Sequence, residues 1–134
     1  MGIYARIYSM KENTLRRIAP LFRFRHFKFY ALSLFLFNGF LWLFAYSIFI
    51  KSGQGLIFLH SSVDFGVGLI GEAKQVFVIP ILGLVFFLFN FLISFLFSGL
   101  KDFKFLSHLL FSAVFVAHIF LGVSLISIYL INFR

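Results

Sequence analysis

The chain has 134 residues, of which 62% are hydrophobic, 24 are Phe and only 12% are charged. Such a small charged fraction cannot cover the surface of a water-soluble domain, which excludes that class and predicts an all-α integral membrane protein. Cysteine is absent, which excludes disulfides, thiolate catalysis and Cys-ligated metals. The net charge of +8 arises largely before the first apolar stretch. Basic residues in this position are typical of flanks that set the orientation of a membrane protein and contact anionic lipid, rather than of a nucleic-acid-binding surface.

A basic segment occupies residues 1–28. Leu15, Ile18, Ala19 and Phe22 recur at helical spacing, which predicts the apolar face of an amphipathic helix lying in the membrane interface. Its expected contacts with anionic lipid are Arg16, Arg17, Arg23, Arg25 and Lys28. Alternating Phe and basic residues also bind single-stranded nucleic acid, but the adjoining apolar stretch favours lipid, so no nucleic-acid partner is expected.

Three apolar stretches are long enough to cross a bilayer as helices, at about 29–50, 76–97 and 107–132. The second stretch is the clearest, because its 22 residues carry no charge and would extend about 33 Å as a helix. The connections are an outer loop, 51–75, and a short inner loop, 98–106. We therefore expect three transmembrane helices in a single membrane domain, with the second and third antiparallel neighbours.

The outer loop allows two structures. Leu56–His60 and Ser62–Val67 can pair as a small β-hairpin around Ser61 and Ser62. Alternatively, Phe65–Ile70 can enter the membrane as a re-entrant turn, which requires protein or water to satisfy its backbone. A cap at the membrane interface is favoured over re-entry.

The distribution of basic residues predicts the orientation. With three spans, the N-terminal segment and the inner loop share one side of the membrane, and together they carry nine Lys and Arg. The other side carries three, namely Lys51, Lys74 and Arg134. Because cytoplasmic flanks are enriched in Lys and Arg, the N-terminus is expected in the cytoplasm and the C-terminus outside.

Each predicted span carries one strongly hydrogen-bonding side chain within the bilayer, and these are Asn38, Asn90 and His118. From the expected helix ends, the two Asn residues lie at matching depths of about 12–13 Å and His118 at about 16 Å. The three residues can therefore form an interhelical polar cluster that fixes packing. Alternatively, His118 serves as a proton relay or ligand residue. Packing is favoured because no span contains an acidic partner.

A second candidate cluster lies in the outer loop and consists of His60, Asp64 and Glu72. One His and two carboxylates can bind zinc or non-haem iron. The spacing matches no metal-binding motif, and solvated acids or a pair with Lys74 are the favoured interpretation. No hydrolase, Walker or zinc-protease signature is present, so neither a metal nor a cofactor is expected.

The loop and the start of the second span resemble a group of small bacterial three-span membrane proteins. In that group a Leu-His…Phe-Gly loop precedes an apolar helix with an internal Pro and Asn. The corresponding residues here are Leu59, His60, Phe65, Gly66, Pro80 and Asn90. The resemblance implies a location in the bacterial plasma membrane and no activity.

These features favour a non-enzymatic accessory or scaffold subunit of a homo-oligomer or larger membrane complex. The small pair Ala113 and Ala117 offers a face for close helix contact with a neighbour. A minimal oligomeric transporter or channel protomer is the first alternative, and it would need the polar cluster to face water. A lipid-modifying enzyme that uses His60, Asp64 and Glu72 is the second, and it would need those side chains to converge.

Overall fold

The computed structural model describes residues 25–53, 55–62 and 66–134, with side chains outside 60–69. The elements in chain order are α2 (Arg25–Lys51), β1 (Leu56–Ser62), β2 (Gly66–Glu72), the 3₁₀ helix η1 (Ala73–Phe77), α3 (Val78–Leu96) and α4 (Phe103–Phe133). The predicted amphipathic segment, with Arg16, Arg17 and Arg23, lies outside the described residues.

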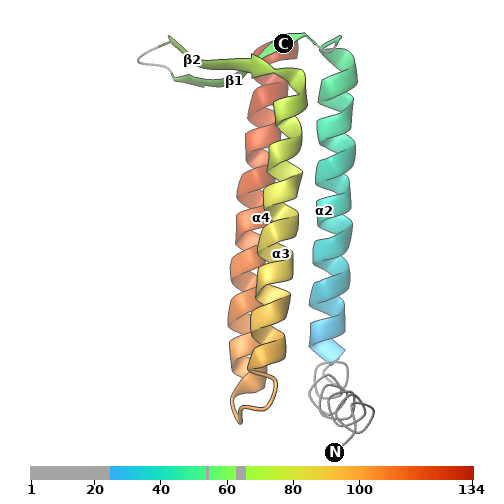
Figure 1. Ribbon diagram of the computed structural model, residues 1–134, viewed down its shortest axis with the longest axis vertical. Helices are drawn as coiled ribbons and strands as arrows, with labels where there is room; N and C mark the ends of the chain where they lie inside the picture. Colours follow the sequence, from blue (N-terminus) through green and yellow to red (C-terminus); the bar gives the residue numbers. More distant parts are fainter. Residues whose placement is uncertain (1–24, 54, 63–65) are drawn as a thin grey trace, which may run out of the picture.

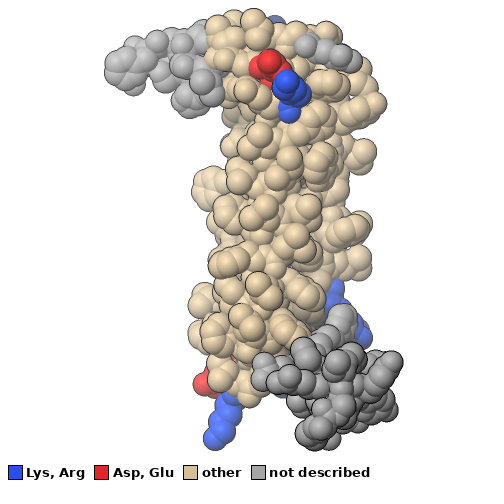
Figure 2. Space-filling view, viewed as in Figure 1, with Lys and Arg blue, Asp and Glu red and all other residues tan. Residues whose placement is uncertain are grey.

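Three helices run side by side as an up-down-up bundle (Figure 1). Each is long and apolar enough to cross a membrane: Arg25–Lys51, Ala73–Leu96 and Phe103–Phe133. On the face seen in Figure 2, charged side chains lie at the two ends of the bundle, with an uncharged belt between them. The prediction of a mainly α-helical membrane protein is thus confirmed to the extent that three helices have the length and apolar character of membrane spans. We refer to the end with Arg25 and Asp102 as the N-terminal end, and to the other as the hairpin end.

The first and third helices begin four residues earlier than predicted, at Arg25 and Phe103. At the start of α2, Phe27 is buried and its ring packs against the rings of Phe91 and Phe111, with centroids 5.7 and 5.2 Å away. Arg25 and Lys28 are exposed on the same turn. The helix continues past the apolar stretch because Phe27 gains a packing site while its charged neighbours stay outside.

The buried residues of α2 alternate by three and four positions, as in a coiled-coil seam. They are Phe27, Leu34, Asn38, Leu41, Ala45 and Ile48. The corresponding central residues of α4 are Phe111, Val114, His118, Leu125 and Ile128. This spacing allows long, nearly parallel contacts between α2 and α4.

The middle helix makes its contacts with small residues. Its buried positions are Pro80, Gly83 and Ser94, while most of its Phe and Leu side chains point outward. Small side chains permit close approach of helix backbones, which is how membrane helices pack when lipid is as apolar as their side chains. Consequently, α3 can pack closely against α2 and α4.

The outer loop forms an antiparallel β-hairpin. The pairs run from Leu56↔Glu72 to Ser62↔Gly66, with irregular register around His60. The hairpin alternative therefore holds, and re-entry of the β2 segment as a turn does not. The predicted turn at Ser61 and Ser62 is wrong, because both residues belong to β1 and the pairing continues to its end.

The hairpin projects sideways from the bundle (Figure 1), and its root is anchored to α4. Asn132 donates from Nδ2 to the Phe58 carbonyl at 2.8 Å and accepts from the Phe58 N–H at Oδ1 at 2.9 Å. The side-chain amide thus pairs with β1 as a neighbouring strand would. Ile57 is buried in the apolar cluster that the helices form at the hairpin end.

Lys51 closes the same end of the bundle. Its Nζ donates to Tyr129 Oη at 2.8 Å and lies 4.7 Å above the centre of the Tyr129 ring. This contact joins the last turn of α2 to α4 while the ammonium group remains at the end of the apolar belt.

We predict that Asn132→Ala will release the hairpin root from α4. Two hydrogen bonds, each worth about 1 kcal/mol, are removed, so Phe58 should lose protection. Hydrogen exchange of the protein in micelles, followed by mass spectrometry of the 56–62 region, should show faster exchange. Asn90→Ala is the control, because among the described residues the Asn90 amide bonds within its own helix, to the Phe86 carbonyl. Unchanged exchange in the Asn132 variant would contradict the anchor.

Candidate functional site

Two of the three predicted polar side chains meet at Gly83, in the middle of the bundle. A Cβ atom on Gly83 would lie 2.6 Å from Asn38 Nδ2 and 3.2 Å from His118 Nε2. Asn38 comes from α2, His118 from α4 and Gly83 from α3. The absence of a side chain at Gly83 therefore creates the space in which the polar groups of its two neighbouring helices approach each other.

Asn38 joins α2 to α3. Its Nδ2 donates to the Pro80 carbonyl at 3.0 Å, and the residue is only 5% exposed. A carbonyl oxygen has two lone pairs, so it can accept this bond in addition to a bond within its helix. The interaction fixes the height of Asn38 against the first turns of α3.

His118 is fully buried, and its ring is held by its own helix. Its Nδ1 lies 2.9 Å from the Val114 carbonyl. Because a carbonyl only accepts, Nδ1 carries the proton, which leaves Nε2 as an acceptor in the neutral ring. Nε2 has no hydrogen-bond partner among the described residues. The Phe37 ring packs beside the imidazole, with centroids 5.8 Å apart.

Asn90 does not join this site. Its Nδ2 donates to the Phe86 carbonyl one turn earlier in α3, at 3.0 Å. Asn38 bonds at Pro80, ten residues from Asn90, which is about 15 Å along the helix. The expected equality of depths is therefore wrong. The depths differ because the helix bounds differ from the apolar stretches. The helix α2 begins four residues earlier, which places Asn38 farther from the N-terminal end, while α3 ends at Leu96, close to Asn90.

Two of the outer-loop residues, His60 and Glu72, lie at different levels of the hairpin. Leu56 pairs with Glu72, whereas His60 lies four residues further along β1, about 13 Å away. Glu72 is exposed and forms an ion pair with Lys74, as the favoured interpretation of the sequence expected. Asp64 and the His60 side chain lie outside the described residues. Within the described part of the chain, no group of three His, Cys, Asp or Glu residues could hold a metal ion.

Further polar contacts between elements, including the bond between Lys51 and Tyr129, were not predicted. At the N-terminal end, Tyr30 Oη and His108 Nδ1 form a hydrogen bond of 3.1 Å between α2 and α4. At the hairpin end, Asn132 anchors β1. Tyr30, His108 and Asn132 all lie near the ends of apolar stretches, where polar residues are common. The sequence could have singled out these residues only if it had also shown which polar partner lies opposite each of them in the membrane.

No family model, curated protein or solved structure matches this chain. The functional argument therefore depends on the residues and their arrangement.

We predict that Gly83→Ala will destabilise the bundle by about 1–3 kcal/mol, because its Cβ would displace Asn38 and His118. Gly39→Ala is the matched control, since a Cβ there meets nothing within 4 Å. Equilibrium unfolding in mixed micelles measures both variants. A Gly83 variant as stable as the Gly39 variant would refute a tight junction at this position.

Proposed function

We propose that this chain is a non-enzymatic scaffold or accessory subunit of a homo-oligomer or larger membrane complex. The observation that carries this proposal is the hairpin, which extends sideways beyond the helices that support it (Figure 1). Its root is fixed by two hydrogen bonds to Asn132, so its direction is set by α4. An arm held in this way suits a protein that reaches over a neighbouring subunit.

The outward side of α4 supports the same function. Ala113 is exposed and Ala117 half-buried, whereas Val114 and His118 are buried against the other helices. Small residues spaced four apart let a second helix approach closely. A neighbour that packs on Ala113 would therefore find a closer fit than lipid chains provide.

The geometry gives less support to the two alternative functions. Asn38 and His118 are buried against Gly83 instead of lining an open passage, which disfavours a transporter. The hairpin register separates His60 from Glu72, which disfavours an outer-loop enzyme site. The scaffold function requires neither a pore nor convergent catalytic groups.

We further propose that the N-terminal end faces the cytoplasm of a bacterial cell, with the hairpin outside the plasma membrane. Arg25, Lys28, Lys101 and Lys104 belong to the N-terminal end, and Lys51, Lys74 and Arg134 to the other. The remaining five Lys and Arg precede α2 in the chain, so the imbalance favours this orientation.

Orientation is tested with single cysteines, because the natural chain has none. In intact cells, Ser52→Cys at the hairpin end should react with an impermeant thiol reagent, and Gly99→Cys should react only after the cells are opened. Gly99 tolerates the change, since a Cβ there meets nothing within 4 Å. Labelling of Gly99→Cys alone in intact cells would reverse the orientation.

Assembly is tested with Ala113→Phe, which should block close approach of a neighbour and shift the protein to smaller species. The measurement is native mass spectrometry after mild-detergent extraction at native expression. Val116→Phe is the control, because Val116 is already bulky and is exposed on the same helix. If the unmodified protein is a monomer that transports a solute or modifies a lipid by itself, the proposed function is wrong.

A further inference from the structure

An aromatic groove runs between α2 and α4 near the N-terminal end. Its walls are Phe29, Tyr30, Ser33, Phe37 and Phe115, and its volume is about 430 Å³. Four of these five side chains are aromatic and Ser33 supplies the one aliphatic hydroxyl. A site so poor in polar groups does not hold water well, and it lies within the predicted apolar belt.

The dimensions of the groove fit a lipid chain. From Phe29 to Phe37 α2 rises by eight steps, about 12 Å, which is within the half-thickness of about 15 Å of a bilayer core. Spread over that length, the volume gives a cross-section of about 36 Å², less than half of the about 80 Å² of a helix 10 Å in diameter. At its inner end, the Phe37 ring contacts the rings of Phe115 and His118.

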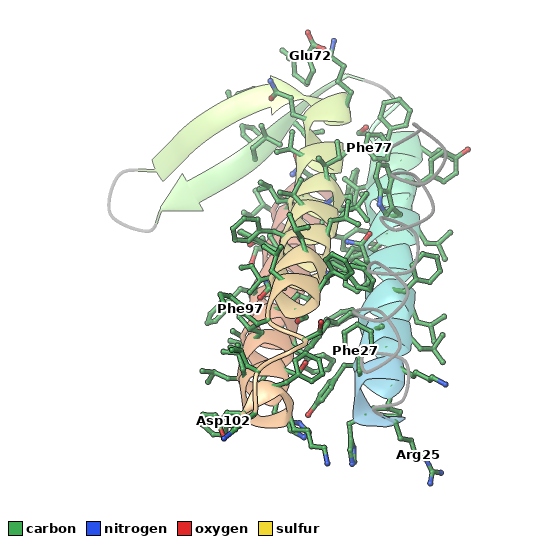
Figure 3. The ribbon with its side chains drawn as sticks, turned by 60° about the horizontal axis from the view of Figure 1, so that its bottom comes forward. Arg25, Phe27, Glu72, Phe77, Phe97 and Asp102 are labelled. Carbon is green, nitrogen blue, oxygen red and sulfur yellow. The ribbon has the colours of Figure 1, made fainter. Side chains whose placement is uncertain are left out.

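Polar and basic groups lie where the groove approaches the N-terminal end of the bundle. The His26 and His108 rings lie 5.4 Å apart there, and His108 is bonded to Tyr30. Lys104 is one turn before His108, on the side of α4 that faces α2. Arg25 is one turn before Phe29 and extends away from the bundle in Figure 3. Both basic residues are exposed.

We propose that this groove binds one acyl chain of an anionic phospholipid, whose phosphate lies between Arg25 and Lys104. The apolar walls accommodate the chain, and the two cations supply the charge complementarity that selects an anionic headgroup. Lys28, an expected lipid contact from the sequence, lies farther around α2 from the groove than Arg25 does, because Arg25 is one turn before the groove residue Phe29 whereas Lys28 is opposite Tyr30 and Phe37.

Headgroup selection is tested by native mass spectrometry of the full chain, titrated with phosphatidylglycerol or phosphatidylcholine. The unmodified protein should retain the anionic lipid preferentially. Arg25→Gln and Lys104→Gln should each weaken its retention by about fivefold, the effect expected for one basic residue near an anionic lipid. Lys28→Gln removes the same charge from the same helix end and should change it little. Equal retention of both lipids, or an equal loss in the Lys28 variant, would overturn the proposal.

Chain position is tested separately by fluorescence. The chain has one Trp, so Trp42→Phe combined with Phe115→Trp places a single reporter in the groove. In nanodiscs, phosphatidylglycerol brominated on its acyl chain should quench this reporter more strongly than brominated phosphatidylcholine does. The two brominated lipids are compared at the same fraction of the total lipid. Adding Ser33→Phe should fill the groove and remove the difference. If both lipids quench the reporter equally in the variant that keeps Ser33, the groove does not select an anionic lipid. Neither test depends on whether the protein assembles.

Discussion

The bundle depends on the close approach of α3 to its two neighbours at Gly83. In a membrane, apolar side chains gain little by leaving lipid for protein, so helix packing relies on shape and on hydrogen bonds. A side chain at Gly83 would collide with Asn38 and His118. Without one, Asn38 reaches the Pro80 carbonyl and the imidazole fits between the helices. Gly83 and its two polar neighbours therefore determine the vertical register of all three helices.

That register in turn positions the hairpin. Asn132 follows His118 by 14 residues, two full heptads, and so lies on the same side of α4 as the buried seam. The Asn132 amide meets Phe58 only if α4 is held at the correct position along α2, the helix that ends at Lys51. The packing at mid-membrane and the direction of the arm are consequently parts of one arrangement. A shift of α4 by one turn, about 5 Å, would separate Asn132 from β1.

The number and type of helices were predictable from the sequence, because long uncharged stretches have few alternative structures. The sequence suggested a cluster of Asn38, Asn90 and His118, but it did not show that Asn38 and His118 meet at Gly83 without Asn90. The predicted depths follow the apolar stretches, whereas Phe27 and Phe103 extend the helices beyond them by packing. In the sequence, Gly83 is only one small residue among several, because its role depends on which side chains of other helices lie opposite. Likewise, the roles of Asn132 and Tyr30 depend on partners more than 70 residues away in the chain.

Side-chain hydrogen bonds join α2 to α4 at both ends of the bundle. At the hairpin end, Lys51, Tyr129 and Asn132 connect α2, α4 and β1 with direct side-chain hydrogen bonds. At the N-terminal end, the Tyr30–His108 hydrogen bond joins α2 to α4 but leaves the aromatic groove beside it open. An acyl chain there would fill space that the protein leaves unpacked, and it would supply the van der Waals attraction that an empty space cannot give to the side chains around it. A lipid bound in the groove would therefore strengthen the packing of α2 on α4 at this end of the bundle. Because Phe37 touches both the groove and His118, that effect would reach the junction at Gly83 through direct packing.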